Sequence, residues 1–131
     1  MQVYLDTSAL VKLVVKEAES PALQTYLGQF LADSRFTVAL ARTELVRAVA
    51  RQHPTDSVAH ARRVLGRLYL VPLTNRLLDA AATMLAPELR TLDAVHLSAA
   101  MTAPDLRAIV TYDTRLTEAA ATAGLAVVAP R

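Results

Sequence analysis

Apolar residues along this chain follow two spacings that alternate from one end to the other. Short runs rich in β-branched residues predict five buried strands, and longer stretches of helical spacing predict seven helices between them. The expected strands are Val3–Leu5, Phe36–Ala39, Tyr69–Val71, Ala108–Thr111 and Ala126–Val128. The expected helices are residues 7–16, 19–32, 41–53, 55–68, 74–86, 91–102 and 114–123. Because strands that alternate with helices form parallel sheets covered on both faces, the pattern predicts an α/β fold with a short five-stranded parallel sheet.

The composition bounds the class of protein. The chain has 131 residues, of which 53% are apolar and 20% are charged, so we expect one folded domain over residues 1–131. It contains no cysteine, which excludes disulfides, thiolate zinc sites and a cysteine nucleophile. No apolar stretch is long enough to cross a membrane, and the first residues lack a basic, signal-like start. We therefore expect no membrane partner and a cytoplasmic location.

The net charge of +2 is unevenly distributed. Residues 42–67 hold six arginines against two acids, a local charge of +4, so the remaining residues sum to −2. The total is too small to indicate a polyanionic partner. Since His53-Pro54 interrupts the basic segment, the two helices expected on either side of it form a basic hairpin.

Two aspartates are expected at the carboxyl ends of strands. Asp6 follows the first strand, and Asp113 follows the strand that ends at Thr111. Side chains at this end of an open parallel sheet face the ligand crevice, so the two carboxylates face each other if their strands are neighbours at the switch point. The simpler interpretation is that each aspartate only caps the helix that follows it. The occurrence of both at strand ends in one small domain favours a site.

Two further acids lie on expected helices with apolar surroundings. Glu44 stands at the edge of an apolar face, where an unpaired carboxylate is costly, and either an i,i+3 ion pair with Arg47 or a functional role explains it. Asp93 lies in Leu92–Met101, a segment that is apolar nearly all round. Its place in the first helical turn explains why the charge is tolerated but not why it stands on a packed face. His96, one turn later, is expected to be a core or rim histidine rather than a metal ligand.

Four carboxylates brought together without four matching cations would repel one another and raise each other's pKa values. A hard divalent cation resolves this repulsion, and ligation by oxygen alone selects Mg²⁺ or Mn²⁺ over zinc. Such a site activates water and stabilises the attacking and leaving oxygens in phosphodiester cleavage. The prediction depends on the convergence of Asp6, Glu44, Asp93 and Asp113.

Four short motifs, in order along the chain, resemble those of PIN-domain proteins and, within that group, of the VapC toxins of type II toxin–antitoxin modules. They are Leu5–Leu10, Thr43–Leu45, Leu92–Ala100, and Val110–Asp113 with its successor Gly124–Val127. Each motif is weak alone, but the four in this order are specific. The resemblance implies a PIN-like three-layer fold with about seven helices around the sheet, and an endoribonuclease that cleaves RNA with metal-activated water.

The resemblance also implies roles for residues at matching positions. Asp6, Asp93 and Asp113 would be the ligands of Mg²⁺ or Mn²⁺, Glu44 would complete the catalytic acidic set, and the Thr111 hydroxyl would support the pocket. Because no acid of this set is missing, we do not expect an inactivated member of the family. The expected partners are an RNA substrate, a cognate VapB-like antitoxin and a second copy of the chain in a homodimer.

Under this resemblance the basic hairpin acquires a functional hypothesis, in which Arg62, Arg63 and Arg67 contact RNA phosphates. The alternative is that these arginines belong to solvated helix faces with local ion pairs. Three other functions stay open. A non-toxin PIN nuclease in RNA processing shares the same site. A phospho-acceptor domain is disfavoured by the single strand-end Asp and by lysines only at Lys12 and Lys16. A non-catalytic RNA- or protein-binding module is disfavoured by the complete acidic set.

Overall fold

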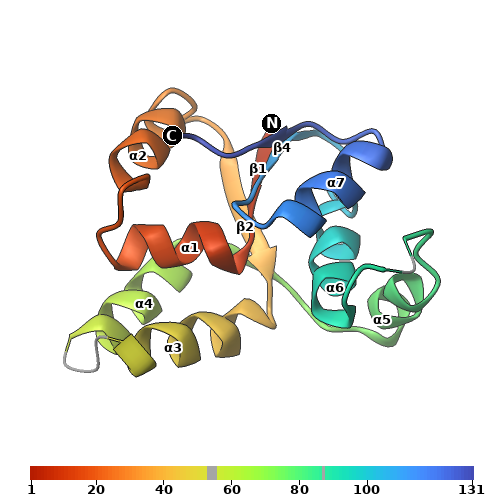
Figure 1. Ribbon diagram of the computed structural model, residues 1–131, viewed down its shortest axis with the longest axis horizontal. Helices are drawn as coiled ribbons and strands as arrows, with labels where there is room; N and C mark the ends of the chain where they lie inside the picture. Colours follow the sequence, from red (N-terminus) through yellow and green to blue (C-terminus); the bar gives the residue numbers. More distant parts are fainter. Residues whose placement is uncertain (53–55, 87) are drawn as a thin grey trace.

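A computed structural model of the protein describes residues 1–52, 56–86 and 88–131, in which strands and helices alternate (Figure 1). The strands are β1 (Gln2–Leu5), β2 (Ser34–Val38), β3 (Tyr69–Val71), β4 (Leu106–Val110) and β5 (Val127–Val128). The helices are α1 (Thr7–Val14), α2 (Ser20–Gly28), α3 (Ala41–Gln52), α4 (Ser57–Leu65), α5 (Asn75–Ala82), α6 (Thr91–Ala100) and α7 (Thr114–Thr122). The predicted helix limits at residues 53 and 55 lie outside the described residues. Several helices end a few residues earlier than predicted, since the apolar pattern continues into the turns that follow them.

The strands form one parallel sheet in the order β3-β2-β1-β4-β5. The central strand β1 pairs with β2 on one side and with β4 on the other. Along the chain, β2 and β3 are added on one side of β1, and β4 and β5 are then added on the other side. This reversal makes the space beside β1 and β4 the switch point of the sheet and confirms the predicted α/β class.

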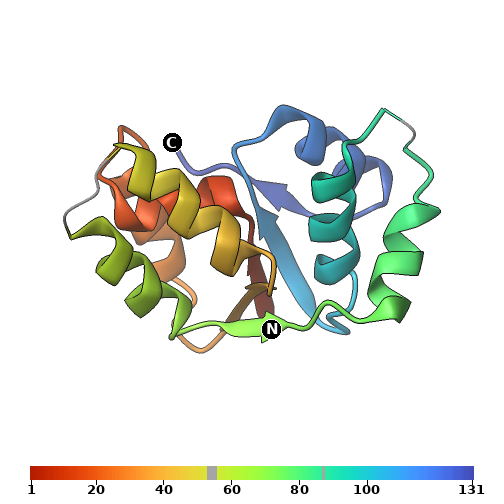
Figure 2. The same ribbon diagram turned by 90° about the horizontal axis from the view of Figure 1, so that it is seen from below.

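Two layers of helices enclose the sheet, with α1–α4 on one face and α5–α7 on the other (Figure 1 and Figure 2). Successive residues of β1 alternate between the layers, as the pleat of a strand requires. Val3 and Leu5 pack with α1–α4, and Tyr4 packs with α5–α7. All three side chains are buried, and full burial of an apolar side chain of this size contributes about 1.5–3 kcal/mol. The two cores hold the helices that carry the acids against opposite faces of the sheet.

The register of the sheet places the ends of β1 and β4 side by side. Leu5 is opposite Val110, and the Asp6 amide donates a hydrogen bond to the Val110 carbonyl (3.2 Å). The residues after each strand, Asp6 and Thr111–Asp113, therefore meet at one edge of the sheet, as predicted for neighbours at the switch point. Across the described ranges, no helix is both long and apolar enough to cross a membrane.

Candidate active site

Asp6 lies at the end of β1 and is almost fully buried, with 4% of its surface exposed. Its Oδ1 accepts hydrogen bonds from the Ala9 amide (3.0 Å) and the Ser8 hydroxyl (2.7 Å), and its Oδ2 accepts one from the Thr111 hydroxyl. Burial raises the pKa of Asp6, although these hydrogen bonds oppose the increase. Asp6 therefore caps α1, as the simpler interpretation predicted, and it is also joined to the end of β4.

Hydroxyl groups join the two strand ends further. The Ser8 hydroxyl accepts a hydrogen bond from the Tyr112 amide (2.9 Å), and the Thr111 hydroxyl accepts one from the Asp113 amide (3.0 Å). Asp113 uses Oδ1 to cap α7 through the Leu116 amide (2.9 Å). Since capping occupies only Oδ1, the other oxygen of Asp113 is available to a cation.

Arg90, the residue before α6, lies between two of the predicted metal ligands. Its Nε is 3.0 Å from Oδ2 of Asp93, and its Nη2 is 3.1 Å from Oδ2 of Asp113. The two carboxylate side chains are 15% and 27% exposed, whereas the Arg90 side chain is 60% exposed. The structure thus brings Asp93 and Asp113 to one cation, although they lie on different elements of the fold.

Glu44, near the start of α3, contacts α6 and α1. Its Oε1 accepts hydrogen bonds from His96 Nε2 (2.7 Å) and from the Thr7 hydroxyl (2.8 Å). Burial raises the pKa of Glu44, but the hydrogen bond and charge of His96, together with Thr7, outweigh it and leave the pKa below its usual value. Of the two interpretations of Glu44, the ion pair with Arg47 is not found, because among the described residues Glu44 pairs with His96 instead.

His96 is buried, with 3% of its surface exposed, which confirms the predicted core histidine. Its Nδ1 lies 2.7 Å from the Tyr4 hydroxyl. A carboxylate only accepts, so the contact with Glu44 requires a proton on Nε2 of His96. The hydrogen-bonded series from Tyr4 through His96 to Glu44 was not predicted from the sequence, because its members lie on β1, α6 and α3.

The four predicted acids fall into two hydrogen-bonded groups, Glu44 with His96 in one and the three aspartates in the other. Within residues 1–52, 56–86 and 88–131, no three His, Asp or Glu side chains are grouped closely enough to hold a metal ion. Arg90 holds Asp93 and Asp113, and His96 holds Glu44. The donor chemistry nevertheless fits a hard cation, because the Oδ2 atoms of Asp93 and Asp113 both contact the positive charge of Arg90. The assignment of Asp6, Asp93 and Asp113 as ligands stays a prediction.

The contacts of Arg90 with Asp93 and Asp113 were not predicted from the sequence either. The i,i+3 spacing of Arg90 to Asp93 is a recognisable ion-pair signal on a helix. The contact with Asp113 has no such signal, because the two residues are 23 positions apart and meet only through the packing of α6 beside the end of β4.

Comparison with known proteins identifies the family of this domain. The chain matches the model of the PIN domain over residues 3–122. It is 46% identical over 129 residues to Ribonuclease VapC46 of Mycobacterium tuberculosis, covering 98% of this chain and 97% of the relative. The chain therefore belongs to the PIN domain family, which confirms the resemblance seen in its motifs.

Two solved structures share the fold at low sequence identity. VapC20 of Mycobacterium tuberculosis, a Sarcin-Ricin loop cleaving toxin, superposes with a TM-score of 0.73 and 16% identity, covering 98% of this chain and 99% of that one. VapBC2 from Rickettsia felis, bound to a DNA fragment from their promoter, gives a TM-score of 0.75 and 14% identity, covering 98% of each chain.

Proposed function

We propose that this protein is a Mg²⁺- or Mn²⁺-dependent endoribonuclease and the toxin of a type II toxin–antitoxin pair. The observation that carries the proposal is the meeting of Asp93 and Asp113 on one cationic group at the carboxyl ends of the strands. An oxygen-only donor set at such a position suits a hard divalent ion. The 46% identical relative is named a ribonuclease, which supports RNA as the substrate.

In this proposal Asp6, Asp93 and Asp113 hold the metal ion, and Glu44 is the fourth acidic residue of the catalytic site. A bound ion would activate water and act as a Lewis acid toward the phosphodiester oxygens. Arg90 has to release Asp93 and Asp113 before they ligate. The Thr111 and Ser8 hydroxyls keep the Asp6 carboxylate in place.

The lowered pKa of Glu44 keeps its carboxylate ionised, which suits a group that orients water by accepting a hydrogen bond. His96 donates to Glu44, and it is itself oriented by the Tyr4 hydroxyl. This arrangement keeps Glu44 ionised at neutral pH and directed toward α6, the helix that carries Asp93. Glu44 is thereby a candidate for orienting the attacking water, with its own orientation fixed by His96.

The proposal extends to partners and location. The structure of VapBC2 from Rickettsia felis supports a VapB-like antitoxin as the cognate partner, and we place the pair in the cytoplasm with its RNA substrate. We also propose a homodimer. Light scattering after size exclusion should give twice the 14.1 kDa chain mass, and co-expression with a small protein encoded beside it should yield a stable complex.

The test of the activity is RNA cleavage by the purified chain in Mg²⁺, Mn²⁺ or EDTA. Asp93→Asn is expected to abolish cleavage, whereas Asp79→Asn, the same change at an exposed position on α5, is expected to retain it. Cleavage that persists in EDTA or in Asp93→Asn would contradict the assignment. A chain that neither cleaves RNA nor binds Mn²⁺ by calorimetry would instead support the non-catalytic binding module.

A further inference from the structure

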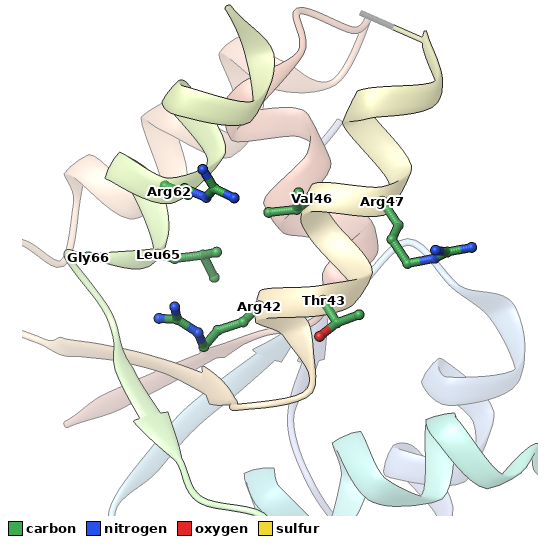
Figure 3. Close-up of a pocket in the computed structure, with 7 residues that line it drawn as sticks. All are labelled: Arg42, Thr43, Val46, Arg47, Arg62, Leu65 and Gly66. Atoms are coloured by element: carbon green, nitrogen blue, oxygen red, sulfur yellow. The ribbon is translucent and has the colours of Figure 1, made fainter. Parts of the chain in front are cut away.

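A cavity of about 470 Å³ lies between α3 and α4, the two helices of the basic hairpin (Figure 3). Three of its lining residues are arginines: Arg42 and Arg47 from α3, and Arg62 from α4. Val46 and Leu65 supply apolar walls. The cavity lies toward the start of α3 and the end of α4.

The charge of this cavity is not neutralised by the residues around it. No carboxylate lines it, and none of the ion pairs found among the described residues involves its three arginines. Figure 3 shows Arg42 and Arg62 extending into the space between the two helices, whereas Arg47 points away from α4. Two guanidinium groups in one hollow repel each other, and an anion between them removes the repulsion.

We propose that this cavity binds a backbone phosphate of the RNA substrate, with Arg42 and Arg62 as its ligands. Guanidinium groups suit this role because their planar forks of N–H donors match the geometry of phosphate oxygens. The proposal rests on the proposed function, since it takes RNA as the substrate. It adds a second contact point, separate from the acids.

The position of the cavity relative to the acids supports RNA as the ligand. Arg42 and Glu44 are two residues apart, so with 3.6 residues per turn they point to nearly opposite sides of α3. Glu44 faces His96 on α6, and Arg42 extends toward α4 (Figure 3). An RNA strand that crosses the start of α3 would therefore reach both. Because carboxylates repel the RNA backbone, a positive cavity on the other side of the same helix offsets that repulsion.

This assignment differs from the hypothesis drawn from sequence, which grouped Arg62 with Arg63 and Arg67. Only Arg62 of these three lines the cavity. The two neighbours on α4, Arg62 and Arg63, are both exposed and carry the same charge, so they form a matched pair. Arg51 on α3 is likewise exposed and outside the cavity lining, and it provides the match for Arg42.

The experiment compares Arg42→Gln/Arg62→Gln with Arg51→Gln/Arg63→Gln, both made in an Asp93→Asn background. Anisotropy of a short fluorescein-labelled single-stranded RNA is measured in EDTA over a series of salt concentrations. Each phosphate contact to single-stranded nucleic acid contributes about 0.7 to the slope of log K against log[salt]. Because the proposal places one phosphate in the cavity, the cavity pair is expected to reduce the slope by about 0.7, and the matched pair is expected to keep the parent slope.

Equal reductions by both pairs would overturn the proposal, because the contribution would then be general surface charge. Unchanged slopes in both pairs would also overturn it and would leave an acidic protein segment as the ligand of the cavity. Thermal unfolding of each variant checks that these exposed substitutions preserve the fold. Binding in EDTA does not depend on cleavage, so failure of the cavity proposal is distinguishable from failure of the nuclease proposal.

Discussion

Replacing Arg90 with glutamine is expected to tighten the binding of Mn²⁺. Arg90 contacts Asp93 at 3.0 Å and Asp113 at 3.1 Å, and a divalent ion ligated by both carboxylates has to displace it. Ion pairs with an exposed partner are weak, and each shifts an equilibrium by about one-and-a-half- to fivefold. Two such pairs therefore oppose metal binding by roughly two- to thirtyfold. Glutamine keeps a polar side chain and removes the charge, so the dissociation constant should fall by a factor in that range.

Calorimetric titration with Mn²⁺ at low ionic strength measures this effect without reference to activity. Arg115→Gln is the matched control, because Arg115 is exposed near the start of α7 and forms no ion pair with another described residue. A smaller change is expected for Arg115→Gln, through loss of general positive charge alone. If Arg90→Gln binds Mn²⁺ no more tightly than Arg115→Gln, the guanidinium does not compete for the metal position and the reasoning fails.

Three further predictions concern groups around the site and the fold. Tyr4→Phe leaves the buried Nδ1 of His96 without its hydrogen-bond partner, so urea unfolding should show a loss of about 1–3 kcal/mol, with the fold retained by circular dichroism. Thr111→Val removes a hydrogen bond to the buried Asp6 carboxylate and should destabilise the fold by a similar amount, about 1–3 kcal/mol; an unchanged midpoint would show that the bond contributes little. The pKa of Asp33 is lowered by the hydrogen bond from Arg107 and by the contact with the N-terminal amino group. Its stabilisation is therefore present at neutral pH and is lost as pH falls through the lowered pKa. Asp33→Asn should reduce the melting temperature at neutral pH and have a smaller effect in strong acid, whereas an equal effect at both would contradict the assignment.

The order of the elements was predictable because it depends on local patterns. Strands and helices were recognised from the spacing of apolar residues, and their alternation requires a parallel sheet with helices on both faces. The strand ends at Asp6 and Asp113 followed from the same pattern. That their strands are neighbours was a condition of the prediction, and it is met because β4 pairs directly with β1.

The partners of the acids were less predictable. Helical spacing suggested Arg47 as the partner of Glu44, but the side chain turns to His96 on another helix, where it forms a part-buried hydrogen bond. A buried or half-buried carboxylate gains more from such a partner than from an exposed neighbour on its own helix, because solvent screens the exposed pair. The competition between these two partners exists only once the helices have packed.

The sequence by itself determined the α/β class, the order of strands and helices, and the four acidic positions, because periodicity, capping residues and short motifs are properties of neighbours along the chain. The tertiary structure alone decided that Arg90 joins Asp93 to Asp113, that His96 orients Glu44, and that Arg42 and Arg62 share one cavity while Arg63 does not. The contacts of Arg90 and His96 join residues on different elements, and the cavity includes Arg62 but not its neighbour Arg63. Their physical cause is the packing of two helical layers against the sheet, which sets the distances between side chains on different elements. These distances cannot be predicted from the spacing of residues along the chain.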